Sequence, residues 1–98
     1  IENMSLVLED AKLLLQAYDV GINGTRVDYY KDEEGTFRFE KLDKLDLGDD
    51  EVESKKTYLD SGIVYYYIEF IKGQYYFYLS GQDYELLKEL AYKVEAKF

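Results

Sequence analysis

Apolar side chains are most concentrated near the C-terminal end of the chain, where their spacing predicts a hairpin. Ile63–Ile71 is a run of nine residues that are all β-branched or aromatic except Glu69, a composition that favours a strand. A tight turn is predicted next, because Gly73 can adopt a positive φ at little steric cost. Tyr75–Leu79 then forms the returning strand.

The hairpin is followed by a predicted helix. Ser80–Asp83 ends the sheet, and Asp83 or Ser80 can accept hydrogen bonds from the free N–H groups of the first helical turn. We expect Gly81 to permit a sharp corner, with a positive φ as one way to make it. Apolar residues then recur at helical spacing; they are Leu86, Leu87, Leu90, Ala91 and Val94. We expect the Leu86, Leu90 and Val94 positions to face the hairpin.

The N-terminal two-thirds of the chain has weaker patterns. Ser5–Tyr18 has the apolar periodicity of a helix, and Thr25–Lys31 and Thr36–Leu42 make a second hairpin candidate. Asp43–Ser54 is acidic and is the stretch with the least evidence of order, and Lys55–Leu59 reads as a short strand. The fold class is therefore α+β: one domain, residues 1–98, with an antiparallel sheet of about four to five strands and the N- and C-terminal helices packed on it. Ile63–Ile71 should be a central strand, because both of its faces are apolar.

Tyrosine is unusually frequent, with 12 copies in 98 residues. Tyr65 and Tyr67 share one face of their strand, because side chains alternate along a strand. Depending on register, they are joined across the turn by either the Tyr76 and Tyr78 pair or the Tyr75 and Phe77 pair. Phenol rings are good core residues of a sheet, but they are also enriched at recognition surfaces. We predict a binding surface that includes some of Tyr65, Tyr67, Tyr76 and Tyr78; the alternative is that two helices cover these rings.

Composition and charge narrow the function classes. The chain has no Cys and no His, so nucleophilic catalysis and zinc binding lack their usual residues, and we expect no enzyme, no cofactor and no metal. The acidic stretch has Gly48 at its centre, but Leu45 and Leu47 occupy positions where a calcium-binding loop needs acids. Whether this stretch binds a cation weakly stays open. The net charge of −9 argues against nucleic acid as a partner.

Two segments resemble a known family. Gly73–Gly81, followed by Tyr84–Ala91, is similar to the end of a bacterial domain-of-unknown-function family found as the extracytoplasmic C-terminal part of anti-sigma-factor-like proteins and lipoproteins of Gram-positive bacteria. The resemblance covers about residues 62–94, and Phe70 replaces the tryptophan usual before the turn. It implies an extracytoplasmic binding or sensory domain that is not an enzyme and has no established catalytic residues.

These observations leave two functional hypotheses. The first is an extracytoplasmic domain, membrane-anchored or secreted, that binds a protein or peptide; contact with a membrane would occur only through an anchor absent from this chain. The second is a cytoplasmic acidic inhibitor, immunity protein or DNA mimic that docks on a basic partner. The excess of carboxylates in residues 1–62 is its support. The oligomeric state is left open by the sequence.

Overall fold

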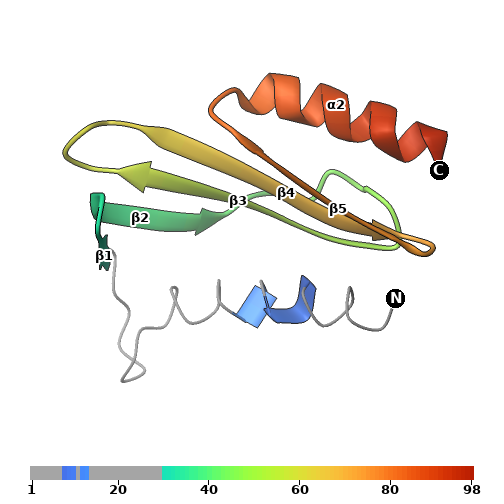
Figure 1. Cartoon of the computed structure of the whole chain (residues 1–98), viewed down its shortest axis with the longest axis horizontal. Helices are drawn as coiled ribbons and strands as arrows, with labels where there is room; N and C mark the ends of the chain where they lie inside the picture. The colour runs from blue at the N-terminus through green and yellow to red at the C-terminus, as the bar shows by residue number, and fades with distance from the viewer. Residues whose placement is uncertain (1–7, 11, 14–29) are drawn as a thin grey trace.

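The fold is an antiparallel sheet of five strands with a C-terminal helix packed on it (Figure 1). The computed structural model describes residues 8–10, 12–13 and 30–98. Residues 8–10 and 12–13 are helical. The other elements are β1 (Tyr30–Asp32), β2 (Gly35–Lys41), β3 (Asp50–Tyr58), β4 (Val64–Lys72), β5 (Tyr75–Gly81) and α2 (Tyr84–Lys97). The predicted α+β class is therefore confirmed.

The five strands form a simple antiparallel meander in the order β1-β2-β3-β4-β5. Strand β4 corresponds to the predicted strand Ile63–Ile71 and pairs with β3 on one side and β5 on the other. The prediction of an interior strand is confirmed, although the middle position of the sheet belongs to β3. Gly73 makes the turn between β4 and β5 with a φ of 59°, as expected.

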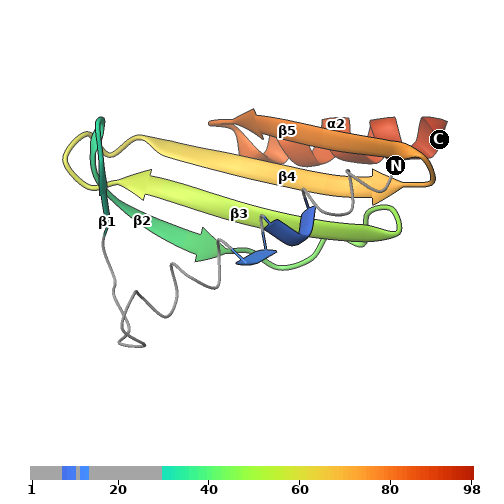
Figure 2. The same cartoon turned by 60° about the horizontal axis from the view of Figure 1, so that its bottom comes forward.

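Helical segments lie on both faces of the sheet: α2 covers one face, and residues 8–10 and 12–13 lie against the other (Figures 1 and 2). Beneath α2, a buried cluster joins the loop between β2 and β3 to β4 and the helix; it contains Leu47, Ile68, Phe70, Leu87 and Ala91. On the opposite face Leu8 packs with Val52 and Ile71. Strand β4 thus contributes core residues to both layers, which explains why its sequence is apolar on both faces.

The corner before α2 uses a capping side chain rather than an unusual glycine conformation. The Asp83 carboxylate accepts a hydrogen bond of 3.1 Å from the backbone N–H of Leu86, as predicted for an N-cap. Gly81 does not have a positive φ, so that part of the prediction is wrong. The chain leaves β5 in an ordinary backbone conformation, and the turn is made at the following residues.

The face that α2 buries differs from the expected one. Leu87 and Ala91 are buried and Val94 packs against them, whereas Leu86 and Leu90 are 50% and 42% exposed. Residues 87, 91 and 94 lie within about 60° of one another on a helix, because successive residues are about 100° apart. The expectation that Leu86 and Leu90 face the hairpin is therefore wrong. The row of Leu86 and Leu90 and the row of Leu87, Ala91 and Val94 both have helical spacing, and the second row is the one that packs on the sheet.

The acidic stretch Asp43–Ser54 is more ordered than its composition suggested. Its second part belongs to β3, which therefore begins at Asp50 rather than at Lys55 as predicted. Gly48 makes the preceding loop possible, because it has a φ of 57° and a side-chain carbon there would lie 2.2 Å from the Ile71 carbonyl oxygen. The loop is therefore packed closely against the end of β4.

The N-terminal predictions fall only partly within the described residues. Residues 8–10 and 12–13 agree with the predicted helix Ser5–Tyr18, and the rest of that helix lies outside the described part of the chain. The same holds for residues 25–29 of the predicted strand Thr25–Lys31, of which Tyr30 and Lys31 belong to β1. The predicted hairpin is present between β1 and β2, with the register Asp32 opposite Gly35.

Candidate functional site

The register between β4 and β5 decides which tyrosines lie together. Tyr76 is opposite Ile71 and Tyr78 is opposite Glu69, so both point to the same side as Tyr65 and Tyr67. Of the two pairings that the sequence allowed, the structure has the Tyr76 and Tyr78 pair. We call Tyr65, Tyr67, Tyr76 and Tyr78 the tyrosine face; it lies on the side of the sheet opposite α2.

Aromatic contacts continue across this face from β2 to β5. The ring of Tyr67 lies between that of Phe39, with centroids 6.2 Å apart, and that of Tyr78, at 6.3 Å. Tyr65 meets Tyr58 edge-on at 6.1 Å. Tyr78 is 54% exposed, while Tyr65, Tyr67 and Tyr76 are half-buried. The face therefore combines rings fixed by their neighbours with one ring that projects into solvent.

Tyr76 is the most constrained tyrosine of the four. Its ring packs against the Leu8, Val52 and Ile71 cluster, and its hydroxyl donates a hydrogen bond of 2.9 Å to Oε1 of Glu69. Burial and the neighbouring Glu69 carboxyl raise the pKa of Tyr76. Burial also raises the pKa of Glu69, an effect that the bond from Tyr76 opposes. Tyr76 thus acts as a support for the face rather than as an exposed contact.

A pocket of about 370 Å³ opens beside Tyr65 and Tyr67. The other side chains around it come from the β1–β2 turn, β3 and β5; they are Glu34, Lys56, Tyr58 and Ser80. Burial raises the pKa of Tyr67, so its hydroxyl keeps its proton at neutral pH and can donate a hydrogen bond there. The pocket offers aromatic surface together with hydroxyl, ammonium and carboxylate groups.

Lys56 in this pocket is held by a network with β1. Its ammonium lies 2.9 Å from Oδ2 of Asp32, and the Tyr58 hydroxyl donates to the same oxygen at 2.7 Å. The ammonium also lies 4.4 Å from the centre of the Phe37 ring. These hydrogen bonds lower the pKa of Asp32. Burial alone would lower the pKa of Lys56, but the hydrogen bonds of the ammonium group outweigh this effect and raise its pKa. Lys56 therefore remains a fixed cation at the edge of the tyrosine face.

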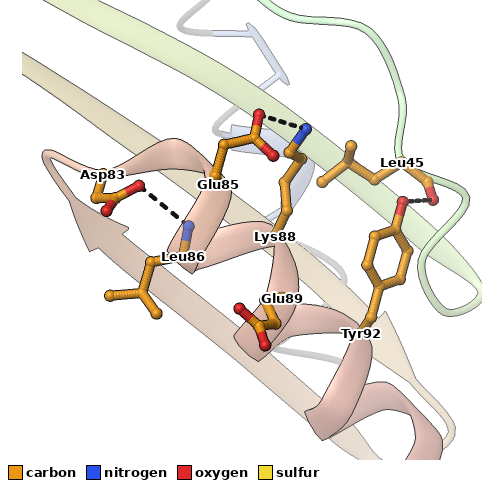
Figure 3. Close-up of a pocket in the computed structure, with 7 residues that line it drawn as sticks. All are labelled: Leu45, Asp83, Glu85, Leu86, Lys88, Glu89 and Tyr92. Atoms are coloured by element: carbon orange, nitrogen blue, oxygen red, sulfur yellow. Dashed lines mark hydrogen bonds and ion pairs between the residues drawn. The ribbon is translucent and has the colours of Figure 1, made fainter.

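A second pocket, of about 590 Å³, lies on the other side of the molecule beside α2 (Figure 3). The Tyr92 hydroxyl donates a hydrogen bond of 2.9 Å to the Leu45 carbonyl and connects the helix to the loop. Lys88 pairs with Glu85 at 2.9 Å. The polar groups of this pocket are thus largely engaged with one another, and we regard the tyrosine face as the stronger candidate site.

Two carboxyl groups of the acidic stretch are inside the protein. Glu51 accepts hydrogen bonds of 2.7 Å from the backbone N–H groups of Leu45 and Leu47, which holds the loop against the sheet. Glu53 is 1% exposed, and neither of its carboxyl oxygens has a hydrogen-bond partner within the described part of the chain. Burial raises the pKa of Glu53 to about 9, and the neighbouring Glu51 carboxyl adds to this effect. Glu53 is therefore a neutral acid at pH 7.

In residues 8–10, 12–13 and 30–98, no group of three potential metal-binding side chains is close enough to hold an ion. Within the same residues, no helix is long and apolar enough to span a membrane. No family model, curated protein or solved structure matches the chain.

Sequence reasoning selected the four tyrosines but missed the residues that complete the pocket. Lys56 and Tyr58 share a face of β3, and their alternation within the predicted strand Lys55–Leu59 was visible in the sequence. Their position beside Tyr65 follows from pairing, because Lys56 is opposite Tyr65 in the β3–β4 register. That pairing could not be deduced from the pattern of either strand alone.

Proposed function

We propose that this protein is a non-enzymatic binding domain that recognises an extended segment of a protein partner through the tyrosine face. The observation that supports this proposal is the register that brings all four predicted tyrosines to one side of the sheet, next to the pocket around Tyr67. Tyrosine is well suited to such a surface, because its ring gives apolar contact and its hydroxyl gives a hydrogen bond.

The roles of the residues follow from their surroundings. Tyr78 supplies exposed aromatic contact, and Tyr65 and Tyr67 form the wall of the pocket. Tyr76 holds the face in place through Glu69. The net charge of −9 favours a neutral or basic ligand, since an acidic one would be repelled during approach. Lys56 provides a local site for a carbonyl oxygen or a single acidic group.

We further propose an extracytoplasmic, sensory setting for this binding domain, on the basis of the resemblance of residues 62–94 to the bacterial family named above. The coding sequence upstream of Ile1 tests this directly. A signal peptide or a membrane-spanning segment there supports the proposal, whereas a start codon close to Met4 contradicts it.

The acidic-inhibitor alternative receives less support from the arrangement of the carboxyl groups. Glu51 and Glu53 contribute to the acidity of the sequence, but their side chains are buried and cannot meet a basic partner. Asp50 is paired with Lys12 at 2.6 Å, and Asp32 is paired with Lys56. A DNA mimic needs exposed carboxylates in a regular array, and these four residues do not provide one.

Replacing Tyr78 with alanine is expected to weaken peptide binding by about tenfold or more, because aromatic contacts commonly dominate recognition surfaces. The measurement uses random peptides displayed on phage, selected on the wild-type protein and then titrated against the variant. We expect the selected peptides to be neutral or basic and to lose affinity for Tyr78→Ala.

The matched control is Tyr75→Ala. Tyr75 lies on the same strand with a similar exposure of 52%, but it points to the opposite side of the sheet and contacts Phe98. Peptides bound by the tyrosine face should tolerate this change. Selected peptides that bind the Tyr78→Ala variant as tightly as the wild type would contradict the proposed function.

A further inference from the structure

Strand β5 forms one edge of the sheet, and no other described strand pairs with its outer side (Figure 2). Its sequence, YYFYLSG, has no charged residue and no proline. Edge strands of monomeric proteins usually carry charges, prolines or bulges that prevent pairing with another chain. Among the described residues the outer side of β5 has no strand partner, and the strand has neither a charge nor a proline to oppose such pairing.

An apolar strip of α2 lies alongside this edge. One flank of the helix contacts the loop before β3, through the bond from Tyr92 to Leu45 and a bond from the Gly48 N–H to Glu95. Leu86 and Leu90 are on the opposite flank, which therefore overhangs the outer side of β5. Figure 3 shows Leu86 pointing away from Tyr92 and Leu45. Both leucines are well exposed, although they have the spacing of a helix-packing surface.

We propose that the chain forms a two-fold symmetric dimer in which β5 pairs antiparallel with β5 of a second copy. The two sheets become one continuous sheet, and the two α2 helices lie side by side on the same face. Leu86 and Leu90 of each copy then cover those of the other. An extended peptide could form backbone hydrogen bonds with β5, but it would bring no helix to cover the two leucines. A second copy of the chain supplies both a pairing strand and a covering helix.

Charge favours this arrangement despite the acidic net charge. Residues 75–82 carry no charge, so the paired strands do not repel each other. Lys93 and Lys97 lie on the same flank of α2 as Leu86 and Leu90, near the end of the helix. This end of α2 lies beside the start of β5, because the Phe98 ring contacts the Tyr75 ring with centroids 4.7 Å apart. Antiparallel pairing brings that end next to Asp83 at the start of the second helix. Each copy therefore places lysines near an acid of the other.

The proposed dimer would enlarge the tyrosine face, but its formation does not depend on peptide binding there. Tyr76 and Tyr78 lie on β5, so the tyrosine faces of the two copies would become neighbours across the new strand pair. The dimer can exist whether or not the face binds a peptide. Loss of dimerisation and loss of peptide binding are measured separately, so each proposal can fail alone.

The first test is sedimentation equilibrium of the wild-type chain and of a Leu86→Lys, Leu90→Lys variant. We expect a concentration-dependent dimer for the wild type and a dissociation constant at least about tenfold higher for the variant. Leu59→Lys is the control, because Leu59 is 47% exposed in the turn after β3, away from β5. Circular dichroism verifies that every variant folds. A wild-type chain that stays monomeric, or a dimer unaffected by the double change, would overturn the proposal.

The second test uses the absence of cysteine from the chain. Single cysteines are placed at Tyr76, Tyr78 and Ser80 along β5 and oxidised under mild conditions, with Leu59→Cys as the control. We expect one β5 position to give the highest yield of disulfide-linked dimer, because only residues near the two-fold axis meet their own copies. Equal yields at all four positions would indicate random collision and contradict strand pairing.

Discussion

Replacing Glu53 with glutamine is expected to stabilise the protein at neutral pH by on the order of 3 kcal/mol. Glu53 is almost completely buried on the side of the sheet that carries α2, and Glu51 lies beside it on the same face of β3. In the folded protein burial raises the pKa of Glu53 to about 9, whereas its ordinary value is 4.5. Folding at pH 7 therefore requires this carboxyl to take up a proton, and glutamine removes that requirement while keeping the shape.

The effect of the Glu53→Gln change depends on pH in a defined direction. Between pH 4.5 and about 9 the unfolded chain holds fewer protons at this position than the folded chain, so the wild-type free energy of unfolding falls as pH rises. The variant lacks this fall. Urea unfolding at pH 5, 7 and 8.5 should show the smallest stability difference at the lowest pH and a widening difference above it. A difference that does not change with pH would contradict the assignment.

Glu51→Gln is the matched control, and it should act in the opposite direction. Both oxygens of Glu51 accept hydrogen bonds from the loop N–H groups, and an amide nitrogen cannot accept one of them. Leaving a buried backbone N–H without a partner costs about 1–3 kcal/mol. Two neighbouring glutamates on one strand face are thus expected to give stability changes of opposite sign.

Leu87→Ala is expected to reduce the free energy of unfolding by about 2–5 kcal/mol, the range for a buried leucine. Leu87 is 7% exposed and packs in the cluster with Ile68 and Phe70. Leu90→Ala should cost less than about 1 kcal/mol in the monomer, because this side chain is 42% exposed and leaves no closed cavity. Chemical denaturation at low protein concentration measures both values.

The comparison of Leu87 with Leu90 also bears on the proposed dimer. If Leu90 is covered by a second copy, Leu90→Ala should lower stability more at high protein concentration than at low concentration, because dimer formation stabilises the folded state. Leu87→Ala should show the same loss at both concentrations. Equal losses for the two variants in the monomer would contradict the orientation of α2.

Local patterns in the sequence determined most of the elements. The β-branched and aromatic run of β4, the glycine turn at Gly73 and the Asp83 cap are short-range features whose physical causes lie within a few residues. The α+β class followed from them, because the last helix has to bury an apolar face against the hairpin. The acidic stretch misled the prediction, since its charges concealed a strand whose alternate side chains, Glu51 and Glu53, point inward.

Tertiary structure alone decided which face of each element is buried. Leu86 and Leu87 are one residue apart and equally apolar, and only the position of α2 over the sheet selects Leu87. The pairing of β4 with β5 placed Tyr76 and Tyr78 beside Tyr67, and the pairing of β3 with β4 added Lys56. Register is a property of two strands together, and one residue of slip would turn every side chain to the other face. The tyrosines were therefore recognisable in the sequence, but their common surface exists only in the folded sheet.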